Sequence, residues 1–418
     1  MLQLSKLEDL DIQLIDGDRG ENYPSRDEFY ENEYCLFLDA NNITSNGFDF
    51  SSTHFITKEK DTKLRNGKLQ RNDIVIMTRG SVGNIALYDN SIKFPNIRIN
   101  SGMLIIRCGK LINPLNVYYQ FKSPIVIKQI NDFMSGSVQK QLPVSILKEI
   151  KIFTCSKNNA NFLKLIDGKI ALNNKTNTEL ENMAKTIYDY WFTQFDFPDK
   201  NGHPYKTSGG QMVYNETLKR EIPAGWEVGK LGFYLENFGD GIHGTPEYDD
   251  SGEYYFINGN NLGNKLISFT SNPLRVNDEE YKKIQRPLNE NTILLSINGT
   301  LGSISFYNGE KIAIGKSACF LNIKEKEVKP FIYQILCSEK FQKYMYTVAS
   351  GSTIKNFAPK QAADFDIPIP PKDLLEQFYN TTYSYLENQI KNEKENKELT
   401  KLRDYLLPLL MNGQIEVK

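Results

Sequence analysis

Hydrophobic and polar positions alternate in short runs through the first part of this chain. Apolar segments rich in β-branched residues occupy 34–38, 73–77 and 103–106, and polar turns separate them. The stretch 114–133 instead has apolar residues at helical spacing. Strand-like runs mixed with a helical segment predict a mixed α/β globule up to about residue 156.

A different period begins near residue 158 and continues to about 196. Leu180, Met183 and Ile187 are spaced by three and four positions, which is the heptad seam of a long helix. A linker follows, and the Gly and Pro content of its residues 199–210 argues against regular structure there.

The same order of features then returns. Gly-Ser-Val-Gly at 80–83 recurs as Gly-Thr-Leu-Gly at 299–302, and the seam recurs as Leu399, Leu402 and Leu406, each 219 positions later. A second long helix is expected from about 373 to 411. The chain is therefore predicted to be a duplicated protein whose two halves present two related recognition surfaces. Its predicted segments are a first globular domain, 1–156; a first long helix, 157–196; a linker, 197–221; a second globular domain, 222–371; and a second long helix, 372–412.

Polar residues occupy the predicted seam midway along both helices. Extending the first seam backwards reaches Asn173 and Thr176, and extending the second reaches Asn392 and Glu395. Asparagine in a helix seam lowers stability but fixes register. We therefore expect the two helices to pair with each other, antiparallel if the halves are related by a local two-fold axis. The alternative is that both middle segments are exposed to solvent.

Composition favours a cytoplasmic protein. The chain has 418 residues, of which 40% are hydrophobic, and it shows neither an export signal nor an apolar stretch long enough to span a bilayer. Its five cysteines are scattered without a Cys-x-x-Cys pair, which argues against a disulfide framework or a zinc ribbon. The net charge of −1 argues against nucleic-acid binding, although the stretch 58–71 is locally basic.

Catalytic and cofactor motifs are missing from the sequence. His54, His203 and His243 have no Cys or Glu partners at metal-ligand or nucleophile spacing. No glycine-rich cofactor loop opens a βαβ unit. These observations point to a protein that recognises a partner and has no catalytic site or cofactor of its own.

Two pairs of small-residue loops recur in both halves. The Gly-Ser/Thr-x-Gly turns at 80–83 and 299–302 permit positive φ and expose backbone N–H groups to a phosphate. The loops 135–140 and 350–355 have the pattern Ser-Gly-Ser-x-x-Lys, which combines flexible backbone, hydroxyl groups and one cation. The alternative is that the glycines serve turn geometry alone.

Five segments occur in a fixed order within the duplicated chain: Asp-Arg-Gly-Glu-Asn-Tyr-Pro-Ser at 18–25, Tyr-Asp-Tyr-Trp-Phe at 188–192, Ser-Gly-Gly-Gln-Met-Val at 208–213, Arg-Glu-Ile-Pro-Ala-Gly-Trp at 220–226 and Leu-Leu-Pro-Leu-Leu-Met-Asn-Gly at 406–413. With these segments the chain resembles the specificity subunits of type I restriction-modification systems over essentially its whole length. The resemblance implies two target recognition domains, each reading half of a bipartite DNA sequence. It also implies that the two helices form an antiparallel coiled coil that sets the spacer between the half-sites.

The resemblance further implies the partners: double-stranded DNA, two methyltransferase subunits that methylate an extruded adenine, and restriction subunits bound through that complex. The residues expected to contact DNA are Arg79, Ser81, Ser137 and Lys140 in the first domain and Asn298, Thr300, Ser352 and Lys355 in the second. An exposed aromatic set, Tyr188, Trp191 and Phe192, is expected to dock the methyltransferase, and its spacing fits core packing equally well.

Aligned positions of the two domains differ, as Arg79 and Asn298 do, and this predicts an asymmetric target with unlike half-sites.

Two other functions stay open on the sequence. One is recognition for a restriction class in which one partner both methylates and cuts. The other is a scaffold whose globules bind no DNA, which the near-neutral charge favours.

Overall fold

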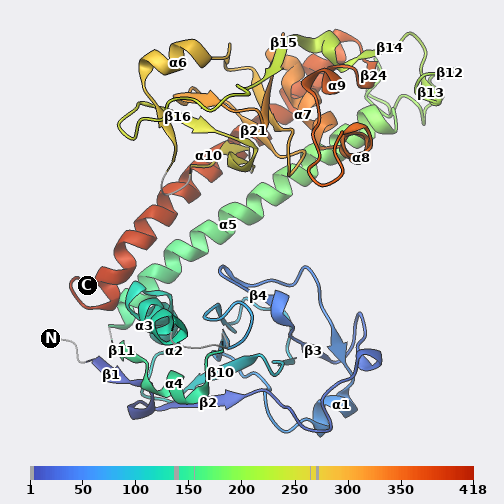
Figure 1. Cartoon of the computed structure of the whole chain (residues 1–418). Helices are drawn as coiled ribbons and strands as arrows, with labels where there is room; N and C mark the ends of the chain where they lie inside the picture. The colour runs from blue at the N-terminus through green and yellow to red at the C-terminus, as the bar shows by residue number, and fades with distance from the viewer. Residues whose placement is uncertain (1–3, 136–140, 155, 264, 270–272) are drawn as a thin grey trace. The chain divides into compact units, whose positions relative to one another are not determined.

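The computed structural model describes residues 4–135, 141–154, 156–263, 265–269 and 273–418. The chain divides into two compact units (Figure 1). Unit 1 comprises Met1–Ala171 and Lys397–Lys418, and unit 2 comprises Leu172–Asn396. Each unit therefore contains one globular domain and a part of both long helices.

Unit 1 is built on an antiparallel sheet in which successive side chains enter two different cores. Its strand order is β2-β10-β7-β8. Along β7, Ile74 and Ile76 pack with helical residues on one face, whereas Val75 and Met77 pack in a separate cluster on the other. This is the period of two that a strand imposes, and it explains why β7 reads as one continuous apolar run. The strands are β2 Ile12–Asp16, β7 Ile74–Met77, β8 Ile85–Leu87 and β10 Met103–Cys108.

A second sheet in unit 1 has the order β6-β3-β9, with β3 parallel to β9 and antiparallel to β6. The remaining elements of this domain are short. They are β1 Leu4–Lys6, β3 Cys35–Phe37, β4 Ile43–Thr44, β5 Gly47–Phe48, β6 Phe55–Ile56, α1 Lys58–Lys63, β9 Ile97–Arg98, α4 Val144–Glu149 and β11 Lys151–Phe153.

The helix expected over 114–133 is two helices, α2 Pro114–Lys122 and α3 Pro124–Ser135. Ser123 between them is extended, with ψ 148°. Proline cannot continue the hydrogen-bond ladder and disfavours the helical conformation of the residue before it, so Pro124 ends one helix and begins the next. Both helices contribute residues to the same core cluster as Ile74 and Ile76.

Unit 2 repeats this topology. Its four-stranded sheet has the order β15-β23-β20-β21, and its three-stranded sheet has the order β19-β16-β22 with β16 parallel to β22. The predicted duplication of a mixed α/β domain is therefore confirmed. The strands of these two sheets are β15 Leu235–Asp240, β16 Tyr254–Ile257, β19 Arg275–Val276, β20 Thr292–Ser296, β21 Ile304–Phe306, β22 Ile312–Ile314 and β23 Ala318–Ile323.

The other elements of unit 2 complete its domain and the hairpin that precedes it. They are β12 Met212–Asn215, β13 Arg220–Pro223, β14 Glu227–Lys230, β17 Leu262–Gly263, β18 Leu266–Ile267, α6 Asp278–Ile284, α7 Lys329–Cys337, α8 Glu339–Val348, α9 Pro359–Ala363 and β24 Asp366–Ile369.

Two long helices follow the two domains. The first, α5, spans Lys157–Tyr188 and continues into a π-helical turn at Asp189–Thr193. The second, α10, spans Lys372–Met411 with Pro408 inside it. Gly413 follows with φ 73°, the left-handed conformation that glycine adopts without strain after a helix. Among the described residues, no helix is long and apolar enough to cross a membrane.

Buried amides lie where α5 meets α10 in unit 2. Asn173 donates to Glu395 (2.8 Å) and to Asn396 (2.9 Å), and Asn177 donates to Glu393 (2.9 Å). Asn173 and Asn396 are 3% and 7% exposed. Residue numbers fall along α10 as they rise along α5, so the two segments run antiparallel within this unit. Of the predicted polar seam positions, Asn173 is buried and Asn392 is half-buried, whereas Thr176 and Glu395 are exposed.

The register of the seam differs from the prediction in both helices. Thr176 is exposed, and Met183 and Leu402 are 48% and 44% exposed. Ala184 is buried next to Met183, and Arg403 lies next to Leu402 and pairs with Asp167 at 3.0 Å within unit 1. A straight α-helix has 3.6 residues per turn, so a strict heptad drifts away from the buried face.

Candidate nucleic-acid interface

The β7–β8 hairpin of unit 1 ends in the first Gly-Ser/Thr-x-Gly turn. Gly80 and Gly83 have φ of 72° and 89°, in the left-handed region that favours glycine. Arg79 and Ser81 are exposed at this tip. The turn therefore requires its glycines for backbone geometry, and it presents two candidate residues to solvent.

The tip is fixed by two other segments of unit 1. The carbonyl of Gly102, just before β10, accepts hydrogen bonds from the N–H groups of Thr78 (2.9 Å) and Arg79 (3.2 Å). The carbonyl of Thr78 accepts from the N–H of Leu142 (3.0 Å). The backbone of Arg79 is therefore held, while its side chain is exposed.

Unit 2 has the same construction at the β20–β21 hairpin. Gly299 and Gly302 have φ of 74° and 86°. Thr300 is exposed, and Asn298 is partly exposed in the position of Arg79. The two tips thus share a backbone conformation and differ in the side chain that precedes the turn.

Both predicted loops of unit 2 meet at this tip. The N–H of Gly299 donates to the carbonyl of Lys355 (3.1 Å), and Asn298 forms a β-bridge with Asn356. Ser352 lies in the same small loop and is exposed. The structure therefore brings Asn298, Thr300 and the 350–356 loop into one cluster, which sequence spacing alone could not establish.

Unit 1 has the corresponding bridge between Arg79 and Gln141. The two remaining candidates of this unit, Ser137 and Lys140, lie outside the described residues. For unit 1 the structure therefore locates only the hairpin part of the candidate cluster.

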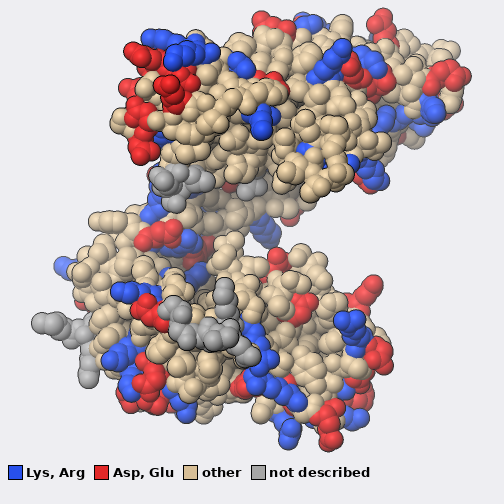
Figure 2. Space-filling view, viewed as in Figure 1, with Lys and Arg blue, Asp and Glu red and all other residues tan. Residues whose placement is uncertain are grey.

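Several cations of the basic stretch 58–71 are engaged within unit 1. Lys60 pairs with Glu28 at 2.7 Å, and this bond from the ammonium lowers the pKa of Glu28 to about 2. Lys68 pairs with Asp61 at 2.5 Å. On the visible face of each unit, Lys and Arg are interspersed with Asp and Glu (Figure 2). A cation that is already paired neutralises phosphate less well, so the basic stretch is a weaker candidate than the tips.

The counterpart of this stretch in the second repeat, residues 275–286, also has cations that are engaged within unit 2. The guanidinium of Arg275 lies 4.6 Å from the ring centre of Tyr255 and donates to its hydroxyl (3.2 Å). Lys282 pairs with Asp278 at 2.6 Å.

Among the described residues, no group of three His, Cys, Asp or Glu side chains is placed to hold a metal ion.

Comparison with known proteins identifies the family. The sequence model of the type I restriction modification DNA specificity domain matches twice, over residues 6–182 and 223–401. The chain belongs to this family of specificity subunits. The two matches coincide with the duplicated halves.

Two relatives of this chain are specificity subunits of type I restriction enzymes. It is 26% identical to the specificity subunit of the type I restriction enzyme MjaIX of Methanocaldococcus jannaschii, over 82% of this chain and 78% of that protein. It is 22% identical to the HindI specificity subunit of Haemophilus influenzae, over 96% and 98%. A crystal structure of a type I S subunit from M. genitalium shares the fold, with a TM-score of 0.59, 14% identity, and coverage of 100% of this chain and 97% of that one.

The aromatic set of the specificity subunit differs from the expected exposed patch. Phe192 is 2% exposed, and its ring centre lies 4.8 Å from that of Phe331 and 5.1 Å from that of Phe378. Burial raises the pKa of Tyr188, and Trp191 packs partly buried against the same cluster. The expected exposure is therefore wrong for Phe192 and only partial for Tyr188 and Trp191, because Phe331 of α7 and Phe378 of α10 pack against the face of α5 that the three rings share.

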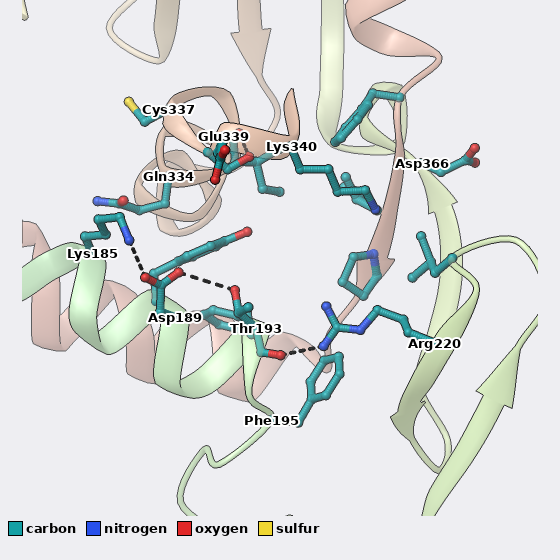
Figure 3. Close-up of a pocket in the computed structure, with 18 of the residues that line it drawn as sticks. Lys185, Asp189, Thr193, Phe195, Arg220, Gln334, Cys337, Glu339, Lys340 and Asp366 are labelled. Carbon is teal, nitrogen blue, oxygen red and sulfur yellow. Dashed lines mark hydrogen bonds and ion pairs between the residues drawn. The ribbon is translucent and has the colours of Figure 1, made fainter. Parts of the chain in front are cut away.

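A recess in unit 2 was missed by the sequence analysis. The end of α5, the start of β13 and the start of α8 line a pocket of about 380 Å³ that contains Arg220 and Lys340 (Figure 3). These segments are far apart in the chain and share no motif. No pattern in the sequence could have indicated that the two cations face one cavity.

Proposed function

We propose that this chain is the non-catalytic DNA-recognition subunit of a type I restriction-modification complex and reads a bipartite, asymmetric target. One observation supports this most strongly: two units of the same topology each present a rigid hairpin tip, and the tips differ in side chain at Arg79 and Asn298. A repeated backbone with unlike side chains is what reading two unlike half-sites requires.

Each tip is proposed to read base edges in the major groove. Arginine pairs bidentately with guanine and asparagine with adenine, so Arg79 and Asn298 would read different bases. Phosphate contacts hold a protein in register without reading sequence. The neighbouring hydroxyls and lysines are proposed for that role: Ser81, Ser137, Lys140, Thr300, Ser352 and Lys355.

The long helices are proposed to form an antiparallel coiled coil that sets the spacer between half-sites and docks two methyltransferase subunits. That docking is proposed for Tyr188 and Trp191, which are partly buried. Phe192 is proposed to support the α5 surface on which they lie. Restriction subunits would join through the methyltransferase complex. The methyltransferases would also neutralise much of the DNA phosphate, which fits the near-neutral charge of this chain.

The buried amide layer allows a test of the spacer role. Replacing Asn173 and Asn396 together by leucine should change the free energy of unfolding of unit 2 by no more than about 1 kcal/mol, because apolar side chains replace both partners of a buried hydrogen bond and the other partners, Asn174 and Glu395, are exposed to water. It should also relax register, so that motifs with other spacer lengths become methylated. Thermal denaturation and methylation mapping measure the two effects. Asn182→Leu, an exposed change on α5, is the matched control; an unchanged spacer in the double variant would contradict the role.

The decisive experiment is single-molecule sequencing of genomic DNA from cells that contain this chain and a cognate methyltransferase, compared with cells that lack the chain. We expect a bipartite N6-methyladenine motif with two unlike halves, and we expect it to disappear completely with the chain. A palindromic motif would contradict the asymmetric reading.

Two other outcomes would change the proposal. Unchanged methylation with an active methyltransferase would favour a scaffold that binds no DNA. A motif that depends on one partner protein with both methylation and cleavage activity would place the chain in a different restriction class.

A further inference from the structure

The pocket at the end of α5 has an apolar lining with charged groups around it. Its walls include the aromatic rings of Tyr188, Phe192, Phe195 and Phe365, and its volume is about 380 Å³. All of its lining residues belong to unit 2. A concave, largely apolar recess of this size with a few convergent polar groups is typical of a ligand site.

Each acidic side chain that lines the pocket already has a lysine partner. The pairs are Glu181 with Lys265 (2.7 Å), Asp189 with Lys185, Glu339 with Lys343 (2.5 Å) and Asp366 with Lys230 (2.8 Å). The carboxylates of the pocket are therefore neutralised, and none of them is left over for a further cation.

Two cations in the pocket have no carboxylate partner among the described residues. The guanidinium of Arg220 lies 4.4 Å from the ring centre of Phe195 and donates to the backbone carbonyl of Thr193. The ammonium of Lys340 lies 5.7 Å from the ring centre of Phe365. In Figure 3 both side chains extend into the space between β13 and α8.

The charge of Arg220 acts on Lys340. Lys340 is an exposed residue, and burial of part of its side chain, followed by the positive charge of Arg220, lowers its pKa, whereas the carboxylate of Asp366 raises it. Burial lowers the pKa of Arg220 as well. Like charges that share a partly desolvated site are unfavourable unless an anion joins them. The pocket therefore lacks a negative charge that a ligand would supply.

The lining decides which anion fits. A duplex is a convex rod that presents its phosphates to a surface, and a phosphate has no apolar group to cover the aromatic and aliphatic walls of this recess. A carboxylate attached to an apolar group satisfies both features, because the apolar part covers the rings and the carboxylate reaches the two cations.

We infer that Arg220 and Lys340 form a carboxylate site, and that its occupant is an acidic side chain or chain terminus of the methyltransferase partner, flanked by apolar residues. This inference rests on the proposed function. The partner is favoured over a free organic acid because the end of α5 builds one wall of the pocket, and α5 is the helix proposed to dock the methyltransferase.

The first test uses the full-length chain alone with benzoate as the probe. Benzoate should raise the thermal midpoint of the wild-type chain saturably, and phosphate at equal ionic strength should do so much less. Lys340→Gln should abolish the benzoate effect, and Lys340→Arg should retain it. Lys326→Gln, which removes an exposed lysine of unit 2 that does not line the pocket, should behave as wild type.

The second test measures the affinity of the same four proteins for the methyltransferase. Loss of one partner of a buried, hydrogen-bonded charge pair weakens an interface strongly, so Lys340→Gln should lower affinity about tenfold or more. Lys340→Arg and Lys326→Gln should stay close to wild type. These results together with the benzoate effect would establish the site.

Four outcomes would overturn the inference. The first is no benzoate effect with unchanged affinity of Lys340→Gln. The second is benzoate binding through Lys340 with unchanged methyltransferase affinity, which would assign the pocket to a free organic acid. The third is a Lys340→Gln defect confined to DNA binding by the assembled complex, which would assign it to a backbone phosphate. The fourth is a wild-type chain that does not bind the methyltransferase at all; it would also overturn the proposed function, and the benzoate result would distinguish that failure from the lack of a site.

Discussion

Replacing Arg98 by leucine is expected to destabilise the domain of unit 1 by about 3 kcal/mol, because the buried carboxylate of Asp61 then keeps only the half-buried Lys68 as a cation and three backbone carbonyls lose their donor. Arg98 and Asp61 are 5% and 4% exposed. The guanidinium donates to Asp61 Oδ1 (2.6 Å) and to the backbone carbonyls of Asp61 (2.7 Å), Asn66 (2.7 Å) and Leu64 (3.0 Å). One side chain thus ties β9 to α1 and the loop that follows.

Native-state hydrogen exchange at the amides of Leu36 and Leu38 would measure this effect. These N–H groups donate to the carbonyls of Asn96 and Arg98, so their exchange reports the opening of β3 from β9. Burial raises the pKa of Asp61, but bonds from Lys68 and Arg98 outweigh burial and hold the pKa below its usual range. The contribution of these bonds to the free energy of unfolding is fully present at pH values above the usual pKa range of aspartate, and it is lost as pH falls through the lowered pKa. The difference between wild type and variant should therefore shrink in acid.

Two further variants make the result specific. Lys63→Leu, an exposed change on α1, should alter stability by no more than about 0.5 kcal/mol. Adding Asp61→Leu to Arg98→Leu should recover at least half of the loss, since no charge then stays buried alone. Unit 2 has Ala313 in an apolar cluster at the corresponding position of β22, so the fold does not require an ion pair there. Equal instability of single and double variants would show that the bonds to backbone carbonyls dominate.

Arg79→Ala is expected to lower methylation of the target about 10- to 100-fold and to relax the sequence requirement in one half-site only. A good bidentate contact between a side chain and a base contributes about 1–3 kcal/mol of discrimination. Asn298→Ala should have the same effect on the other half-site. The measurement is methylation rate by the assembled complex on a set of duplexes in which each target position is varied in turn.

The matched control is Lys110→Ala. Lys110 is exposed just beyond the C-terminal end of β10, whereas the Arg79 tip is bonded to Gly102 at the opposite end of that strand. Its loss should leave both half-sites unchanged. A uniform loss of methylation across all duplexes with Arg79→Ala would identify a phosphate contact instead of base reading, and a smaller salt dependence would accompany it.

The duplication could be predicted from sequence because small residues at turns and apolar residues in strands are local requirements. The turn at 80–83 needs glycine at positive φ wherever it occurs, so its return at 299–302 marks a second copy. The apolar run of β7 likewise predicts a buried strand, and its alternate residues do enter two cores. The prediction of a single helix over 114–133 failed at Ser123, because Pro124 follows it and ends the first helix.

Other features depended on what packs against each residue. Met183 and Leu402 fit the heptad but lie outside the buried face, because the rotation of a helix relative to its neighbour is set by the whole interface. Phe192 has an aromatic side chain of the kind that often docks partners, but it is a core residue because Phe331 and Phe378 contact it from distant segments.

Short segments of sequence were thus enough to establish the repeat, most element types, the absence of a recognisable catalytic motif and the family resemblance, since each is carried by residues near one another in the chain. Folding alone brings the loop of Lys355 to the tip of Asn298 and turns Arg220 and Lys340 toward one pocket. Those associations join segments tens to more than a hundred residues apart, and they arise from packing and backbone hydrogen bonds that leave no periodic signal in the sequence.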